Sequence, residues 1–231
     1  MQTWQLKPGR WRWMLILIGA ARVVCGLALP AAGQPAERFE KEILAFEAQD
    51  RQRPPTPGGV MFLGSSSIRL WNLAQSFPEL PAVNRGFGGS HIADSVRVAE
   101  RIVIPHQPRL IVFYAGDNDI AAGKTADQVL ADYQVLVEKI HARLPKTHIA
   151  FLAIKPCPSR WKFYDVQRQA NRLVEGFSKT DRRLVFVDVV KPMLQDDGTP
   201  RPELFQPDKL HLNPTGYKLW TDILTPHLAS P

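Results

Sequence analysis

Cysteine is scarce in this sequence of 231 residues, which contains only Cys25 and Cys157. Cys25 falls in an apolar N-terminal segment that we expect to be removed, and Cys157 would then be the single cysteine. No intramolecular disulfide could form, so a mature exported chain would have to be stable without one. Cys157 stands between two prolines with no histidine nearby in the sequence, which favours a loop or sheet-edge position over a nucleophilic role.

A clustered excess of basic charge is also missing. The chain has 29 basic and 22 acidic residues, a net charge of +7. Residues 1–33 hold four of the basic residues and no acidic one, so the remaining chain has 25 basic against 22 acidic residues, a net charge of +3. Nucleic-acid binding requires a concentrated basic face. We therefore expect no nucleic-acid partner.

Residues 1–33 have the pattern of a secretory signal peptide, in which basic residues precede an apolar stretch and small residues follow at 31–33. The alternative is an uncleaved membrane anchor over residues 13–32, which is long enough to span a bilayer. Arg22 argues against an anchor, because a charge near the centre of a span costs about 2.5 to 3.5 kcal/mol. We predict export to the periplasm or cell exterior, with membrane contact only through this segment if it is retained. A cytoplasmic protein with a misassigned start is the third alternative.

The rest of the sequence shows neither internal repeats nor low-complexity tracts. Residues 34–59 form an N-terminal region, with an amphipathic helix predicted over 36–50 and a proline-rich linker over 53–59. From residue 60 to 231, short apolar runs alternate with segments of helical periodicity, which predicts a parallel sheet covered by helices. Residues 191–207 are predicted to be one long surface loop. The expected strands are 60–63, 110–115, 149–154 and 184–189, and the expected helices are 91–103, 125–144, 163–178 and 214–228.

Ligands of open parallel sheets bind at the carboxyl ends of the strands. After the first apolar run comes Gly64-Ser65-Ser66-Ser67, where a hydroxyl could lie at the positive end of a helix beside N–H groups that accommodate an oxyanion. The alternative is a serine-rich helix cap. Near the C-terminus, Asp208 and His211 lie three residues apart. A carboxylate that holds the Nδ1–H of an imidazole leaves Nε2 free as a general base.

Two further segments stand out, and the second directly follows the expected strand 110–115. The glycine-rich stretch 86–89 permits a turn with an N–H directed inward, but it lacks the spacing of a dinucleotide fingerprint. In Gly116-Asp117-Asn118-Asp119 the Asn118 amide could donate to an oxyanion, and the alternative is an Asx turn. A metal site at Asp117 and Asp119 is a weak alternative, because no second cluster of ligands accompanies them.

Five other residues are candidates of lower weight. His91 could line a pocket, although a surface position is favoured. Arg160 could contact substrate, whereas Trp161 is expected to pack. Trp71 and Trp220 are expected on apolar helix faces in the core. The chain has no Gly-x-Ser-x-Gly elbow, which disfavours the common lipase and esterase fold.

Taken together, four ordered segments resemble the conserved blocks of the SGNH (GDSL-type) hydrolase family: Gly64-Ser65-Ser66, Gly89, residues 116–119 and residues 208–211. The resemblance implies a three-layer α/β/α, flavodoxin-like catalytic domain over residues 60–231, with a central, mostly parallel sheet of about five strands. It implies Ser66 as nucleophile, His211 as base and Asp208 as orienter. The Gly89 N–H and the Asn118 side chain would be oxyanion donors together with the Ser66 N–H.

One position departs from the family pattern, since Ser65 stands where the family has Asp before the nucleophile. Ser65 or Ser67 could therefore be argued as nucleophile, although Ser66 has the family spacing from Gly64. The resemblance implies hydrolysis of carboxylic esters through an acyl-enzyme, with no metal or organic cofactor. The expected substrate is a small-molecule or glycan ester with a small acyl group, with carbohydrate O-acetyl groups as one candidate. The alternatives are a lysophospholipase or thioesterase-type acylhydrolase and a non-catalytic glycan-binding protein on the same fold.

Overall fold

The computed structural model describes residues 1–3 and 37–229. The predicted signal peptide therefore lies outside the described residues, except for its first three. Among the residues described, no helix combines the length and apolarity needed to cross a membrane.

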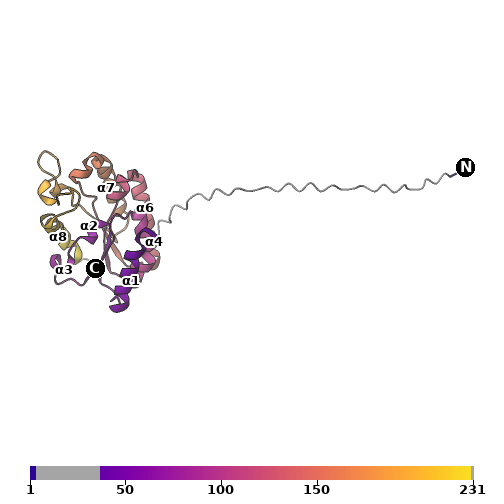
Figure 1. The fold of residues 1–231 in the computed structure, drawn as a ribbon, viewed down its shortest axis with the longest axis horizontal. Coiled ribbons are helices and arrows are strands. Elements are labelled where there is room, and N and C mark those ends of the chain that lie inside the picture. Colours follow the sequence, from indigo (N-terminus) through magenta and orange to yellow (C-terminus); the bar gives the residue numbers. More distant parts are fainter. Residues whose placement is uncertain (4–36, 230–231) are drawn as a thin grey trace, which may run out of the picture. The chain divides into compact units, whose positions relative to one another are not determined.

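A sheet of five parallel strands forms the centre of the domain, in the order β2-β1-β3-β4-β5. The order reverses direction at β1, as in flavodoxin-like folds, and the predicted fold class is confirmed (Figure 1). The switch point lies between β1 and β3, so side chains that follow these strands meet at one edge of the sheet. The strands are β1 (Val60–Gly64), β2 (Ala82–Gly86), β3 (Leu110–Tyr114), β4 (His148–Leu152) and β5 (Leu184–Val187).

Four of the five strands coincide with the expected apolar runs to within two residues, because their side chains are largely buried. The fifth, β2, was not among the four expected strands, although a sheet of about five was expected. Its polar residues conceal the strand pattern, since β2 is an edge strand with its first three residues only half-buried. Asn84 is used locally: its Nδ2 donates to the Ile68 carbonyl at 2.8 Å and its Oδ1 accepts from the Gly86 N–H at 2.9 Å.

The expected helices are present with small shifts at their ends. Helix α6 begins after Thr125, whose hydroxyl accepts from the Gln128 N–H while the Gln128 side chain accepts from the Thr125 N–H. Asn213 caps α8 by accepting from the Gly216 N–H at 3.0 Å. The helices are α1 (Glu40–Gln52, preceded by η1, Glu37–Phe39), α2 (Ser66–Arg69), α3 (Leu73–Ser76), α4 (Ile92–Ile102), α5 (Asp117–Ala121), α6 (Ala126–Arg143), α7 (Tyr164–Ser178) and α8 (Pro214–Leu228), with the short 3₁₀ segments η2 (Ile104–His106) and η3 (Pro158–Phe163).

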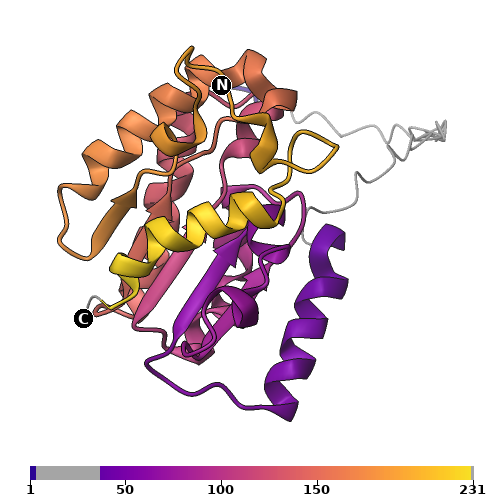
Figure 2. The same ribbon diagram turned by 90° about the vertical axis from the view of Figure 1, so that its left-hand side faces the viewer.

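Helices cover both faces of the sheet, and alternate strand residues enter two separate cores. Leu63 and Phe113 face α4, α6 and α7, whereas Phe62 and Tyr114 face α8. Figure 2 shows α8 in yellow crossing one face of the sheet. Trp71 and Trp220 are buried in this second core as expected, although Trp71 follows α2 rather than lying within a helix.

The N-terminal helix is an integral part of this domain. Ile43 of α1 is buried in the same core as α4 and α6. Asp50 pairs with Arg85 of β2 and, at 2.9 Å, with His106 of η2. Apolar burial and ion pairing together fix α1 against the edge of the sheet.

The proline-rich segment 191–207 was predicted to be one long surface loop, and the structure shows a connection without α-helix or named strand whose residues are mostly exposed or half-buried. Two short turns interrupt it, η4 (Lys191–Met193) and η5 (Pro202–Leu204), each with a proline in its first positions. Met193 and Leu204 anchor the connection, since both are buried in the core beneath α8. Cys157 does lie in a loop, but it is fully buried.

Candidate active site

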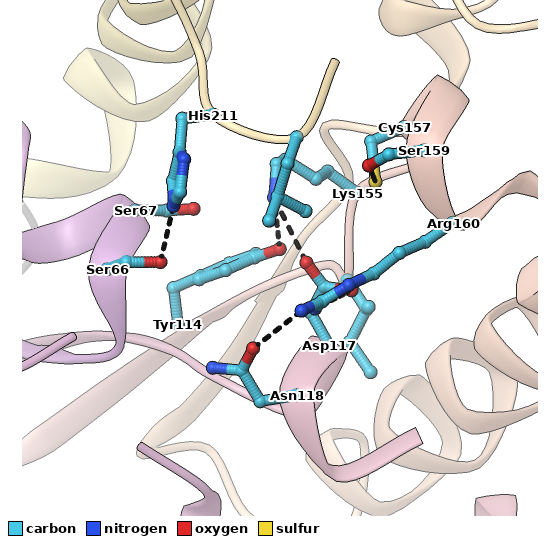
Figure 3. A network of polar contacts seen from close by, with 12 residues as sticks. Ser66, Ser67, Tyr114, Asp117, Asn118, Lys155, Cys157, Ser159, Arg160 and His211 are labelled. Carbon is cyan, nitrogen blue, oxygen red and sulfur yellow. Dashed lines mark hydrogen bonds and ion pairs between the residues drawn. The ribbon is translucent and has the colours of Figure 1, made fainter. Parts of the chain in front are cut away.

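Ser66 is the first residue of α2, two residues after the end of β1. Its Oγ lies 3.0 Å from Nε2 of His211. Ser65 and Ser67 are only 2% and 1% exposed, and the Ser67 carbonyl accepts a hydrogen bond from the Tyr217 hydroxyl. Of the three serines, the structure thus brings Ser66 to the imidazole, as Figure 3 shows.

Gly64 makes the sharp turn before Ser66 possible. Its φ is +142°, and a Cβ at this position would lie 2.0 Å from the Tyr114 carbonyl oxygen. The last residues of β1 and β3 can approach this closely only because Gly64 has no side chain. The turn places Ser66 at the carboxyl edge of the sheet.

Asp208 holds the other side of the imidazole. Its Oδ2 lies 2.6 Å from Nδ1 of His211, and its Oδ1 accepts from the N–H groups of Leu210 and His211. Burial acts to raise the pKa of Asp208, but these hydrogen bonds and His211 outweigh it and lower the pKa to about 2. An ionised carboxylate accepts the Nδ1 proton, so Nε2 is left to accept from the Ser66 hydroxyl.

Gly89 lies in the loop between β2 and α4 with a φ of +79°. This loop is tied to the end of β3 at two points. The Asn118 Nδ2 donates to the Ser90 carbonyl at 3.0 Å, and the Asp119 carboxylate accepts from the Ile92 N–H at 3.3 Å. These two bonds bring the loop that carries Gly89 next to Asn118.

In the segment 116–119, Gly116 is closely surrounded and both aspartates form ion pairs. Gly116 has a φ of +104°, and a Cβ there would lie 2.7 Å from the Ile154 side chain. Asp117 pairs with Lys155 and Arg160. Asp119 is fully buried and pairs with Lys124 at 2.8 Å. Both carboxylates are thus engaged by cations, and within residues 37–229 no three His, Cys, Asp or Glu side chains gather as metal ligands would.

A buried cluster of charged groups lies beneath Asn118. The Lys155 ammonium is 1% exposed and donates to the Tyr114 hydroxyl at 3.1 Å and to Asp117 Oδ2 at 3.2 Å. Burial acts to lower the pKa of Lys155, but the contacts with Tyr114 and Asp117 outweigh burial and raise the pKa above its usual value. For Asp117, burial acts to raise the pKa, and the adjacent Lys155 and Arg160 charges lower it overall. The cluster therefore keeps its charges at neutral pH.

Lys155 was missed from the sequence, although a lysine directly after an apolar strand of a parallel sheet was a usable signal. Arg160 was expected as a possible substrate contact, and the structure shows that its guanidinium contacts Asp117 and Asn118. Trp161 stacks on Tyr164 with ring centroids 4.3 Å apart, which agrees with a packing role. His91 is half-buried at the N-cap of α4, and its N–H donates to Asp94.

Comparisons with known protein families, sequences and structures agree with one another. The GDSL-like lipase/acylhydrolase family profile matches residues 66–219. The human platelet-activating factor acetylhydrolase IB subunit alpha1 is 28% identical over 183 residues, covering 74% of each chain. Among solved structures, a Streptococcus pneumoniae protein proposed to be a platelet activating factor is 20% identical with a TM-score of 0.76, covering 83% of this chain and 93% of its own.

A second solved structure is a variant of an acetyl-xylooligosaccharide esterase from Geobacillus. It is 17% identical with a TM-score of 0.60, covering 76% of this chain and 96% of its own. At these identities the two solved structures show the shared fold, and the family profile carries the assignment because it spans most of the domain. The chain belongs to the GDSL-like lipase/acylhydrolase family and is a carboxylic ester hydrolase.

Proposed function

We propose that the protein hydrolyses carboxylic esters through an acyl-enzyme on Ser66. The observation that carries this proposal is the chain of contacts from Ser66 Oγ through His211 to Asp208, with lengths of 3.0 Å and 2.6 Å. Nucleophile, base and orienting carboxylate within hydrogen-bond reach constitute the arrangement that activates a hydroxyl.

In this mechanism His211 Nε2 takes the Ser66 proton as Oγ attacks the ester carbonyl. The Gly89 N–H, the Ser66 N–H and the Asn118 amide stabilise the oxyanion of the tetrahedral intermediate. His211 then protonates the leaving alcohol, and water repeats the sequence to release the acid. Asp208 stays ionised throughout and stabilises the imidazolium. No step needs a metal or an organic cofactor.

The proposed substrate is an ester of a small acyl group, such as acetyl. Ser66 is only half-buried and the His211 side chain is 22% exposed, so the reacting groups lie near the surface. The turns that follow β1 and β3 are short: one residue separates β1 from α2, and two residues separate β3 from α5. The names of the human acetylhydrolase and the Geobacillus acetyl esterase also favour acetyl. Export of the protein remains part of the proposal and is supported by the composition of residues 1–33.

A fluorophosphonate probe tests the serine assignment, because it reacts covalently with an activated serine. We expect labelling of Ser66 in the folded protein and loss of labelling in Ser66→Ala. Ser67→Ala is the matched control and should keep the label, since Ser67 is buried and contacts no imidazole in the structure. Labelling of Ser65 or Ser67, or no labelling of folded protein, would refute the assignment.

A series of nitrophenyl esters, together with acetylated sugars and a lysophospholipid, tests the substrate class. We expect kcat/KM to be highest for acetate and to fall as the acyl chain lengthens. A maximum at long chains would instead identify a lysophospholipase-type enzyme. Glycan binding without turnover of any ester would identify a non-catalytic protein.

A further inference from the structure

Contacts with Arg160 and with the Ser90 carbonyl determine which way the Asn118 amide faces. Its Oδ1 lies 2.9 Å from an Arg160 guanidinium nitrogen, and its Nδ2 lies 3.0 Å from the Ser90 carbonyl oxygen. A guanidinium can only donate and a carbonyl can only accept. Turning the amide over would place two donors together and two acceptors together, so only one orientation satisfies both contacts.

This orientation leaves one N–H of Asn118 without a partner among the contacts seen. The amide nitrogen has two donors, and the Ser90 carbonyl takes one of them. The other N–H is the donor that the proposed mechanism assigns to the oxyanion. Without the Arg160 contact, only the Ser90 carbonyl would hold this orientation, and a rotated amide would present its oxygen, which repels an oxyanion.

Arg160 is itself held by a rigid buried anchor. Its second terminal nitrogen pairs with Asp117 Oδ1 at 2.8 Å, and its side chain is only 19% exposed. Asp117 is in turn fixed by Lys155 at 3.2 Å and by Gln167 at 3.3 Å. Figure 3 shows Arg160 extending between the Asp117 carboxylate and the Asn118 amide. The planar guanidinium fork suits this double contact, since it offers donors in fixed directions.

Arg160 therefore has both terminal nitrogens engaged by the protein. A substrate group would be left with the remaining N–H groups of Arg160, whose directions Asp117 and Asn118 already fix. The contact to the amide oxygen is charge-assisted, and it polarises the amide so that its N–H groups become stronger donors. The geometry thus favours a role in orienting Asn118 over a direct contact with substrate.

We propose that Arg160, anchored by Asp117, is a positioning residue that fixes the orientation of the Asn118 amide so that its free N–H faces the oxyanion. The inference rests on the proposed function, in which Asn118 is an oxyanion donor. It assigns the loop after β4 a part in catalysis through Asn118 and not through substrate binding.

A double-mutant cycle tests this role with four proteins: the wild type, Arg160→Met, Asn118→Ala and the double variant. Steady-state kinetics use nitrophenyl acetate. Asn118→Ala should lower kcat by on the order of 10² to 10³. Arg160→Met should lower kcat by on the order of ten-fold with KM changed less than about two-fold, as expected when one charge-assisted hydrogen bond is lost. In the Asn118→Ala background, the Arg160 change should have less than about a two-fold further effect on kcat.

Arg183→Met is the matched control for removal of a paired arginine. Arg183 is bonded to Asp181 and to the Pro145 carbonyl, and it precedes β5 at the opposite edge of the sheet from Ser66. It should leave kcat and KM unchanged. If Arg160→Met fails to fold, Arg160→Lys replaces it in the cycle, because it keeps the charge beside Asp117 but cannot hold the two fixed directions.

The outcomes distinguish a failure of the oxyanion role of Asn118 from a failure of the positioning role of Arg160. A kcat loss of ten-fold or less in Asn118→Ala would remove Asn118 from the oxyanion role and with it this part of the proposed function. If Asn118→Ala lowers kcat by the expected 10² to 10³ but Arg160→Met leaves kcat unchanged, the positioning role alone is overturned. A rise in KM with unchanged kcat, or an equal loss in both backgrounds, would also overturn it, because Arg160 would then act independently of Asn118.

Discussion

Replacement of Gly86 by alanine should displace the helix that carries Ser66. Gly86 is the last residue of β2 and is buried. A Cβ at this position would lie 2.2 Å from the Arg69 backbone nitrogen and 2.8 Å from the Ile68 carbonyl carbon, both in α2. Ordinary contact starts at 3.4 Å. Because the opposing atoms are backbone atoms, α2 would have to shift by about 1.2 Å, the difference between 3.4 Å and 2.2 Å.

A shift of this size is large compared with the 3.0 Å contact between Ser66 and His211. A misplacement of about 1 Å in a catalytic group can lower the rate by on the order of 10². We therefore expect kcat/KM for nitrophenyl acetate to fall by on the order of 100-fold, since proximity of Ser66 to the base is lost. Overpacking should also lower the free energy of unfolding by about 1 to 3 kcal/mol.

Denaturant unfolding and steady-state kinetics on the same preparation separate the two effects. Gly176→Ala is the control, because Gly176 lies in α7 and a Cβ there meets no atom within 4 Å. It should keep full activity and gain about 0.5 to 1 kcal/mol in the free energy of unfolding. If Gly86→Ala is folded and retains kcat/KM within two-fold of wild type, the contact between β2 and α2 does not position Ser66.

Three further predictions concern other contacts. Tyr217→Phe removes the hydrogen bond to the Ser67 carbonyl and should lower the free energy of unfolding by about 0.5 to 1.5 kcal/mol; no change by urea unfolding would contradict this. Asp117→Asn leaves buried cations without their carboxylate and should cost about 3 to 5 kcal/mol in the same assay; a much smaller cost would show that water solvates the cations in the variant. Burial lowers the pKa of His106 although Asp50 opposes the shift. Because the unfolded chain then binds the proton more readily, Tm should fall as the pH drops below about 6.5, and His106→Gln should weaken this dependence; an unchanged pH dependence in the variant would show that His106 does not contribute.

The main architecture could be predicted because its physical signals are local. The strands buried on both faces appear as uninterrupted apolar runs, and α6 and α8 carry caps that show in the sequence. Strand β2 was hidden because Asn84 and Arg85 interrupt its apolar pattern and its first three residues are only half-buried. The other edge strand, β5, could be predicted because all four of its residues are apolar.

The position of Ser66 opposite His211 could be anticipated only through the family resemblance, since 145 residues separate them. The cluster of Asp117, Lys155 and Arg160 was harder to predict, because charged residues in a sequence ordinarily indicate exposed positions. Their burial depends on mutual neutralisation among segments that are about 40 residues apart. Such pairing is a tertiary property, and no local pattern contains it.

The segments that follow successive strands each supply one component around the same point: Ser66 after β1, Gly89 after β2, Asn118 after β3, Arg160 after β4 and, at the end of a longer connection, His211 after β5. For directed evolution, this separation divides the chain into a frame and a set of exchangeable loops. Libraries confined to the residues flanking these components should alter acyl preference while the two cores stay intact. The opposite edge of the sheet, where Arg183 binds Asp181, is the place to seek thermostabilising substitutions that leave turnover unchanged.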